Sequence, residues 1–437
     1  MCIRDSTNAD PTSDEESRDR RFNPWRFPKT DNAKQIVADV IQQLQGYEIH
    51  FNRRKRKRKT ADQVIFETSV SAIICDLIHH NLSQSAGGVA ITRSHRILGR
   101  KSRYRPPAYN KKLPDLLDAM SSKEMAYVEQ EIGYETSFGQ SKQTTVRAGK
   151  RLVSRIAELN LIFDDLGVSK KQEVITLKSV KDDIWDNSKV VEYKDTADTD
   201  RYRDELHQIN EWLCAAQIDY DDNQSDPDGP ILDVNDRRLR RIFTRGRFDC
   251  GGRLFDGFWQ LLGKKKRLES LFIDEEEIIE LDYGQMSVRI IYGLCGAEPD
   301  ADDQYDIPNF QDERSGIKKV FNAMLFADKR LSRMPKGVRQ EFQSNHSVEQ
   351  VMHAIERHHA PISHRFFTQI GHEAQFIEST ILMEVLLKLK KEKIVALPIH
   401  DAVLVPRSYE DITKDIMLDV FHKHTNVDGI VTVERDD

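Results

Sequence analysis

Two aspartates follow apolar runs at places where an acidic side chain does not help packing. Asp282 comes directly after residues 278–281, at the expected end of a buried strand. Asp401 follows His400 between the apolar runs 394–399 and 402–405, which predicts a β-hairpin with a carboxylate at its tip. Carboxylates on neighbouring strands can hold two Mg²⁺ ions about 3.5–4 Å apart. Taken alone, Asp282 is equally typical of a helix N-cap or a turn.

A third segment could bind a triphosphate. Residues 314–326 are expected to form a helix, and four residues at every fourth position share one face of it: Arg314, Lys318, Asn322 and Phe326. Two cations followed by a polar and an aromatic residue make a poor core face, but they suit a triphosphate at one end and a base at the other. A solvated amphipathic helix would show the same spacing, so this row gains weight only beside the two aspartates.

In order and spacing, these segments resemble the palm and fingers of the family A DNA polymerases and the related single-subunit, phage-type RNA polymerases. The Asp-Tyr-x-Gln core of the family's motif A is present at 282–285, with the motif's Arg at Arg289. The row on 314–326 is similar to motif B, and His400-Asp401 matches the His-Asp pair of motif C. The resemblance covers roughly the C-terminal half, from near Arg240 to the end. It implies template-directed nucleotidyl transfer with two Mg²⁺ ions, or Mn²⁺ in their place, on Asp282 and Asp401.

The resemblance also implies individual roles. Arg314 and Lys318 fall on triphosphate-binding positions, with Lys318 a candidate proton donor to the leaving pyrophosphate, and Phe326 falls where an aromatic ring stacks at the templating base pair. The other nucleotide-binding candidates are Tyr283, Ser287 and Asn322. The candidates for the primer–template end are Arg253 and Gln260 in a Gly-Arg segment, Gln375 on the helix before motif C, and His400. Glu378 lies near Gln375 in a similar position. For Arg253, a structural role in a turn is equally consistent.

Three departures from the family pattern bear on chemistry. Ser287 stands where the DNA polymerases have a Glu that crowds the sugar 2′ position, so we expect tolerance of ribonucleotides, as in a primase or transcriptase. Asn322 replaces an apolar or aromatic residue, which also affects sugar selectivity. Ala402 replaces the Glu that follows the motif C Asp, so the metal site is expected to rest on Asp282 and Asp401 alone.

Composition limits the class of protein. The 437 residues carry a net charge of −6, which excludes a uniformly basic nucleic-acid binder but not local basic patches. Five scattered cysteines without C-x-x-C spacing argue against zinc and disulfides, and indicate a reducing, cytoplasmic setting. We find neither an apolar run of about 18 residues nor a signal peptide, so no membrane association is expected.

The expected fold class is α+β. Residues 1–30 are expected to be a disordered tail. Residues 31–180 are predicted to be a helical, winged-helix-like DNA-binding domain, with a recognition helix near 144–160 that presents Arg147, Lys150 and Arg151, and a strand at 173–178. An ordinary helical domain with a charged face is the alternative. Residues 181–235 are expected to be a linker and a thumb-like helix. Residues 236–437 are predicted to be a polymerase palm, an antiparallel sheet with helices, with reduced fingers and thumb.

The sequence therefore predicts a DNA polymerase or primase-like enzyme that replicates the DNA of a phage, plasmid or other mobile element. Its partners would be a DNA template and primer, nucleoside triphosphates and other replication proteins. The first alternative is a DNA-binding replication initiator or regulator with a catalytically degenerate palm. A metal-dependent nuclease using Asp282, Asp401 and His400 is a second, and a structural adaptor a third. The preference for dNTPs or rNTPs and for primed or unprimed initiation stays open.

Overall fold

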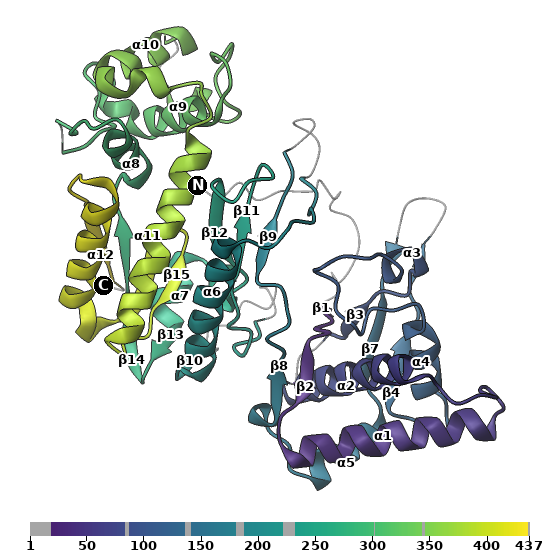
Figure 1. Ribbon diagram of the computed structural model, residues 1–437. Helices are drawn as coiled ribbons and strands as arrows, with labels where there is room; N and C mark the ends of the chain where they lie inside the picture. Colours follow the sequence, from purple (N-terminus) through teal and green to yellow (C-terminus); the bar gives the residue numbers. More distant parts are fainter. Residues whose placement is uncertain are drawn as a thin grey trace. The chain divides into compact units, whose positions relative to one another are not determined.

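A computed structural model of the chain describes residues 19–83, 87–135, 141–180, 188–221, 232–300, 302–342 and 346–435. It divides into two compact units, the first built from the described residues up to Glu173 and the second from those after it. Each unit has its own apolar core. Both combine helices with β-sheets, as expected for an α+β protein (Figure 1). None of the helices in the described ranges has the length and apolar character needed to span a bilayer.

The first unit is organised around the apolar helix α2. Its helices are α1 (Asp31–His50), α2 (Thr60–Leu82), α3 (His95–Leu98), α4 (Leu113–Met120) and α5 (Lys150–Glu158). Its strands are β1 (Arg20–Arg21), β2 (Arg26–Pro28), β3 (Val89–Ile91), β4 (Val128–Glu131), β5 (Tyr134–Glu135), β6 (Ser141–Lys142), β7 (Thr144–Ala148) and β8 (Leu166–Val168). A four-stranded sheet has the order β1-β3-β7-β4. Helix α2 contacts α1, β7 and α5, and it is buried along most of its length from Phe66 to His80, so it forms the centre of this core.

Three sequence predictions for this half of the chain are wrong. Residues 144–148 form strand β7 rather than the start of a recognition helix, so Arg147 lies on a strand and only Lys150 and Arg151 lie on helix α5. Residues 20–28 of the expected disordered tail include β1 and β2, while residues 1–18 lie outside the described residues. The strand expected at the end of the winged-helix domain, β9 (Ile175–Leu177), pairs in parallel with β11 (Arg240–Phe243) of the second unit.

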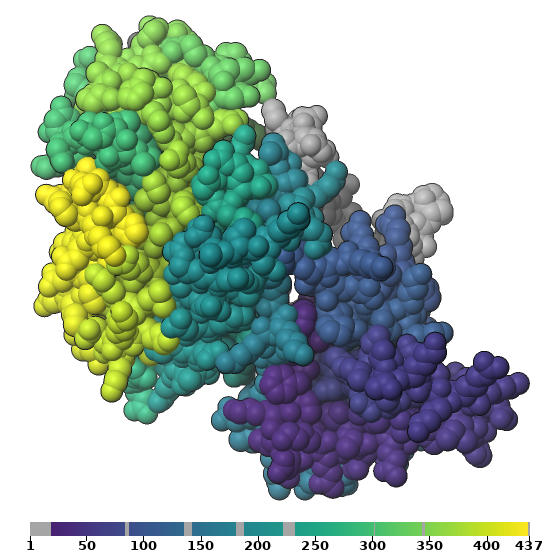
Figure 2. All heavy atoms as spheres, viewed as in Figure 1, coloured from purple at the N-terminus to yellow at the C-terminus, as the bar shows by residue number. Residues whose placement is uncertain are grey.

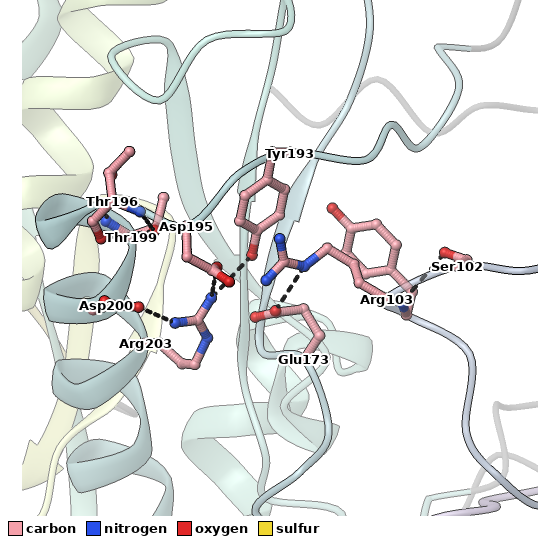
Figure 3. A network of polar contacts seen from close by, with 10 residues as sticks. Ser102, Arg103, Glu173, Tyr193, Asp195, Thr196, Thr199, Asp200 and Arg203 are labelled. Atoms are coloured by element: carbon pink, nitrogen blue, oxygen red, sulfur yellow. Dashed lines mark hydrogen bonds and ion pairs between the residues drawn. The ribbon is translucent and has the colours of Figure 1, made fainter.

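Three arginines of the first unit form contacts within it. Arg147 donates from Nε to the Gly87 carbonyl oxygen at 3.1 Å. Arg151 donates to the Glu124 carbonyl oxygen and its guanidinium lies 5.1 Å from the centre of the Tyr127 ring. Arg103 donates to Glu173 at 3.1 Å (Figure 3). Lys150 is exposed at the first position of α5.

The second unit contains an antiparallel sheet with β14 at its centre. The sheet order is β10-β13-β14-β16-β15, and β17 also pairs with β14. The strands are β10 (Ile218–Tyr220), β13 (Leu271–Ile273), β14 (Glu276–Tyr283), β15 (Leu397–Ile399), β16 (Ala402–Pro406) and β17 (Val431–Glu434). Residues 278–281 of β14 are buried without interruption, as expected for a central strand covered on both faces.

Helices cover this sheet and extend beyond it. They are α6 (Ala197–Ala215), α7 (Lys264–Ser270), α8 (Met286–Leu294), α9 (Arg314–Phe326), α10 (Val348–His358), α11 (Gly371–Lys391) and α12 (Glu410–Thr425). Helix α12 contacts β14 and β16, and α11 lies beside α12 (Figures 1 and 2). From there α11 reaches the group of α8, α9 and α10 at its other end (Figure 1). One helix therefore joins the sheet to this helical group.

A second, three-stranded sheet of the order β12-β11-β9 lies against α11, with β12 spanning Gly251–Phe255. The buried Arg241 donates to the Gly252 carbonyl oxygen at 3.0 Å and to the Ser379 hydroxyl of α11 at 3.0 Å. Gly252 has φ +88°, and a Cβ atom there would lie 2.7 Å from Ser379 Oγ. Only glycine fits such a close approach at positive φ, and this contact holds the next residue, Arg253, beside α11.

The thumb-like helix expected within 181–235 is present as α6. Thr196 caps it, accepting from the Thr199 N–H at 3.3 Å while the Thr199 hydroxyl accepts from the Thr196 N–H (Figure 3). Arg203 donates to Asp195 at 2.8 Å and to Asp200 at 2.7 Å. Helix α6 packs against α11 within the second unit, so it is part of that unit and not of a separate linker. Residues 181–187 and 222–231 of the expected linker lie outside the described residues.

Candidate active site

The two aspartates lie at adjacent positions of one sheet edge. Strands β14 and β16 are antiparallel neighbours, with Asp282 opposite Ala402. Asp401 immediately precedes Ala402, and its carbonyl oxygen accepts from the Tyr283 N–H at 3.3 Å. Directly opposed Cα atoms in such a pair are about 4.5–5.5 Å apart. The predicted hairpin is confirmed, since β15 and β16 pair up to Ile399 and Ala402 and leave only His400 and Asp401 in the turn.

Strained backbone marks both strand ends. His400 in the hairpin turn has φ 53°, and Gln285, directly before α8, has φ 59°. The left-handed conformation costs a residue with a side chain roughly 1–2 kcal/mol. Strain of this kind persists where the surrounding structure enforces it, and it gathers at functional sites.

Asp282 lacks the partners that a buried carboxylate normally has. Its Oδ1 atom is buried, and no group in the described part of the chain forms a hydrogen bond with it. Burial and, next, the negative charge of Asp401 raise the pKa of Asp282, which lies at about 7. The nearby charge of Lys318 acts in the opposite direction. The negative charges of the two carboxylates therefore act on each other, and Lys318 offsets only part of this effect on Asp282.

The cationic row on α9 faces outward as predicted. Arg314, Lys318 and Phe326 are exposed and Asn322 is half-buried, while the opposite face is buried through residues such as Val320 and Met324. The effect of Lys318 on the pKa of Asp282 shows that this row lies near the two carboxylates. The structure therefore brings Asp282, Asp401 and Lys318 together at one site.

Tyr305 lies against the cationic row, and we had not identified it from the sequence. The Arg314 guanidinium lies 5.6 Å from the centre of its ring and the Lys318 ammonium 5.8 Å. Burial raises the pKa of Tyr305, and the charge of Asp401 adds to this effect. Asp303 was missed as well, although it pairs with Arg314, which donates from Nη2 to Asp303 Oδ1 at 3.1 Å. The acidic stretch 302–306 was the available signal.

The other motif A residues hold this loop in place. The Gln285 side chain accepts from the Gln304 N–H at 2.9 Å and donates to the Asp302 carbonyl oxygen at 2.9 Å. Arg289 also donates to the Asp302 carbonyl oxygen, at 3.3 Å. Their contacts show that Gln285 and Arg289 fix the backbone that leads to Asp303 and Tyr305.

One residue of motif A points away from the site. The Tyr283 side chain is buried, and its hydroxyl donates to the Met417 carbonyl oxygen of α12 at 2.6 Å. Its position in the core leaves no room for the nucleotide contact that we expected of this side chain. The alternation of side chains along β14 explains this, because Asp282 and Tyr283 face opposite sides of the sheet. Ser287 is half-buried in the first turn of α8.

The residues expected at the primer–template end separate into two groups. Arg253 donates from Nε to Glu378 Oε1 of α11 at 2.6 Å. Burial lowers the pKa of His400, and the charge of Arg253 lowers it further, so the two lie close together. Gln260 instead donates to the carbonyl oxygens of Leu254 and Pro398, which secures β15 against β12. Gln375 is half-buried one turn of α11 before Glu378.

Phe326 at the end of the row contacts the start of α11. Its ring centre lies 5.0 Å from that of His372, and the two rings meet edge to face. A Cβ atom on Gly371 would lie 2.8 Å from the Phe326 ring. The absence of a side chain at 371 therefore lets this partly exposed ring lie against α11.

The donor set suits a hard divalent cation that keeps water ligands. Within the described ranges, no three His, Cys, Asp or Glu side chains converge as a metal-binding group. Mg²⁺ is commonly bound through one or two carboxylates, with water and substrate phosphates as its other ligands. The buried Oδ1 of Asp282 without a partner, next to Asp401, fits this chemistry.

Comparison with known proteins adds little to this picture. No protein-family model matches the chain, and no curated protein matches it either. Among solved structures, it is similar to the POL domain of Pol1 from M. smegmatis in complex with a DNA primer-template and dNTP. The identity is 10%, the match covers 93% of this chain and 81% of that chain, and the TM-score is 0.31. A likeness this weak carries no conclusion about fold or function, so the assignment below depends on the geometry of the site.

Proposed function

We propose that this protein is a template-directed nucleotidyltransferase that extends the 3′ end of a nucleic acid strand. The observation that carries the proposal is the meeting of Asp282 and Asp401 at one sheet edge, with the cationic row of α9 beside them. Two adjacent carboxylates are suited to divalent cations, and a neighbouring row of positive charge is suited to a triphosphate. A nuclease built on the same aspartates would have no use for this row.

The residues divide the work between the two substrates. Asp282 and Asp401 would hold Mg²⁺, which in two-ion sites stabilises the attacking and the leaving oxygens. Arg314 and Lys318 neutralise the triphosphate, and Lys318 can donate a proton to the departing pyrophosphate. Phe326 offers its exposed edge to the nucleobase. Arg253 and His400, beside the hairpin turn, contact the primer–template end.

Arg314 must exchange partners for this to happen. It is paired with Asp303, and both side chains are partly exposed. Exposed pairs contribute only about 0–1 kcal/mol, whereas hydrogen bonds between charged groups contribute about 1.5–3 kcal/mol. A triphosphate can therefore displace Asp303.

Two finer assignments belong to the same proposal. The small Ser287 leaves space at the sugar 2′ position, so the site accepts ribonucleotides as well as deoxyribonucleotides. Arg147, Lys150 and Arg151, which lie within five residues at the junction of β7 and α5, contribute phosphate contacts that recruit DNA to the first unit. Replication of a phage, plasmid or other mobile element is the setting in which we place this activity.

Primer extension tests the proposal. We would supply labelled dNTPs, and separately rNTPs, to the full chain on primed and unprimed templates with Mg²⁺. Asp401→Asn should lower the rate by about 10³-fold or more, because metal ions contribute several kcal/mol to such transition states and each 1.36 kcal/mol is a factor of ten. No extension by the wild type under any condition would overturn the proposal and favour an initiator with an inactive palm. Cleavage of DNA without nucleotides would instead favour the nuclease.

Two adjacent lysines on α9 give a matched pair for the triphosphate contact. Lys318→Ala should raise the nucleotide KM by about 10–100-fold, the equivalent of a lost charged hydrogen bond of about 1.5–3 kcal/mol. Lys319 forms an ion pair with Glu341, so Lys319→Ala should leave the nucleotide KM within about twofold. Equal effects of the two substitutions would show that α9 acts through general positive charge and not through this row.

A further inference from the structure

Glu378 is a fully buried carboxylate next to the candidate active site. Its residue is 0% exposed, on the part of α11 that lies against β12. Its Oε1 atom accepts from Arg253 Nε at 2.6 Å. Its Oε2 atom is also buried, and no hydrogen bond to it is found within the described residues.

Asp401 lies near enough to act on this carboxylate. The pKa of Glu378 is raised to about 6, because burial and the negative charge of Asp401 outweigh the positive charge of Arg253, which lowers it. Ala402, which follows Asp401, brings no acid to the hairpin. Besides Asp282 on β14, an acidic side chain of α11 therefore also lies in the surroundings of Asp401.

This arrangement is poor for stability. A half-satisfied buried carboxylate beside a second one loses its hydration without full compensation. An apolar side chain of similar volume at a buried ion pair is often neutral or stabilising. Local arrangements that work against stability are expected mainly at functional sites. The pair is therefore better explained by what it does for Arg253 than by a contribution to the core.

Glu378 sets the direction of the Arg253 side chain. The Arg253 side chain is 29% exposed whereas that of Glu378 is 1% exposed. The bond to Nε fixes one edge of the guanidinium, and the same strand β12 brings Phe255 to 6.5 Å from the His400 ring in the hairpin turn. Gly252 and Ser379, in contact next to this pair, hold the two elements at this distance.

We propose that Glu378 is a positioning residue that fixes Arg253 against the priming end of a nucleic acid duplex, the end whose 3′ hydroxyl must reach Asp401. The inference depends on the proposed nucleotidyl transfer and adds to it a residue that touches neither the nucleotide nor the metal. Glu378 acts through Arg253 alone, so its loss should weaken the grip on the duplex end and leave the triphosphate contacts intact.

Binding and kinetics measured separately test this role. We would compare the full-length wild type, Glu378→Gln, Glu378→Asp and Arg253→Ala, first by fluorescence anisotropy with a labelled primer–template in Ca²⁺ without nucleotide. Glu378→Gln should weaken binding by about tenfold, and Glu378→Asp should restore part of it. The double substitution of Glu378 and Arg253 should be no worse than Arg253→Ala, as expected for residues that act as one unit. In extension assays the KM for primer–template should rise while the nucleotide KM stays within about twofold.

A glutamate on the same helix provides the control. Glu384 pairs with Lys423 and His424 at the surface, so Glu384→Gln should change neither KM. A lowered Tm of Glu378→Gln with unchanged primer–template affinity would show a merely structural ion pair and overturn the proposal. Equal rises in both KM values would overturn it too. Should the wild type fail to extend primers while its binding to primer–template depends on Glu378 and Arg253, the nucleotidyl transfer falls and the positioning role stands.

Discussion

Each unit of the molecule has an aspartate with a buried carboxylate oxygen, and the two differ in their partners. Asp76 in the first unit is 0% exposed, and it accepts from Arg26 Nε at 2.9 Å and from the Asn23 N–H at 3.1 Å. Arg20 adds an ion pair at 3.0 Å. Asp282 in the second unit has a buried Oδ1 atom for which the described residues supply no partner. Asp76 is fully buried and Asp282 is half-buried, and among the described residues only Asp76 has donors for its buried oxygen atoms.

The difference separates a structural acid from a functional one. Asp76 joins the start of the chain to α2, and its two arginines balance its charge inside the unit. Asp282 lies beside a second carboxylate, and the positive charge of Lys318 offsets their repulsion only in part, so the pair suits a bound cation. The lack of hydrogen-bond partners for a buried carboxylate oxygen, more than burial itself, is therefore the feature that points to the candidate active site.

The largest effect on stability is expected for substitution of Asp76, the buried acid whose hydrogen-bond partners are present. Asp76→Ala leaves two arginines in the first unit without an anion, so the unit should lose about 3–5 kcal/mol. Chemical denaturation followed by hydrogen exchange in the first unit measures this loss. Asp118→Ala is the control, because Asp118 pairs with Arg93 while 42% exposed, and such pairs contribute about 0–1 kcal/mol. Similar losses for the two substitutions would contradict the view that Asp76 is a structural centre.

Substitution of Asp282 should raise the stability, whereas substitution of Asp76 should lower it. In the absence of divalent cations at pH 8, Asp282→Asn should raise the Tm by about 2–4 °C, the shift expected for about 1 kcal/mol in a unit of this size. The reason is that the substitution removes an ionised carboxylate that lacks a partner. Mg²⁺ should raise the Tm of the wild type, because it binds the folded state, and should have a smaller effect on Asp282→Asn. A lower Tm for Asp282→Asn at pH 8 would show that this acid is satisfied after all.

The pH dependence of this gain follows from the raised pKa. An aspartate with a folded-state pKa of about 7 binds its proton more tightly in the folded than in the unfolded state. Its contribution to stability is therefore present at low pH and is lost as the pH rises toward and through 7. The advantage of Asp282→Asn should accordingly be small at pH 5 and full at pH 8, in thermal scans at matched ionic strength.

The smallest expected effect is on nucleotide affinity, and it comes from Asp303, the partly exposed acid that pairs with Arg314. Asp303→Asn removes the partner that occupies Arg314, so the nucleotide affinity should improve by up to about fivefold, in keeping with an exposed pair of less than about 1 kcal/mol. Equilibrium titration with a nonhydrolysable triphosphate measures it. Glu341→Gln, which frees Lys319 instead, should leave the affinity unchanged. Weaker binding by Asp303→Asn would mean that Asp303 orients Arg314 for the triphosphate.

The sequence predicted those parts of the site that local patterns encode. An apolar run with one acid at its end predicts a strand tip, and residues at every fourth position predict one helix face, so Asp282, Asp401 and the row of α9 were found. The acidic stretch 302–306 was a local signal for Asp303 that we did not use, and Tyr305 lies in the same stretch. The pairing of Arg253 with Glu378 joins residues 125 positions apart, which no local pattern reports. Residues 144–148 show the other limit, since their β-branched Thr144, Thr145 and Val146 favour a strand that a helical interpretation of the charges overlooked.

Under the proposed function, helix α11 also spaces the two substrates. Gly371 at its start receives Phe326, and Glu378 holds Arg253 seven residues later. At a rise of 1.5 Å per residue, these points are about 10 Å apart along the helix axis, close to the length of three nucleotide steps at about 3.4 Å each. A straight helix has a fixed length, so in the proposed function α11 fixes the distance between the incoming base at Phe326 and the primer strand at Arg253. Insertion or deletion of a single helical turn between the two points would change this distance, so that it no longer matches the nucleotide spacing of the duplex.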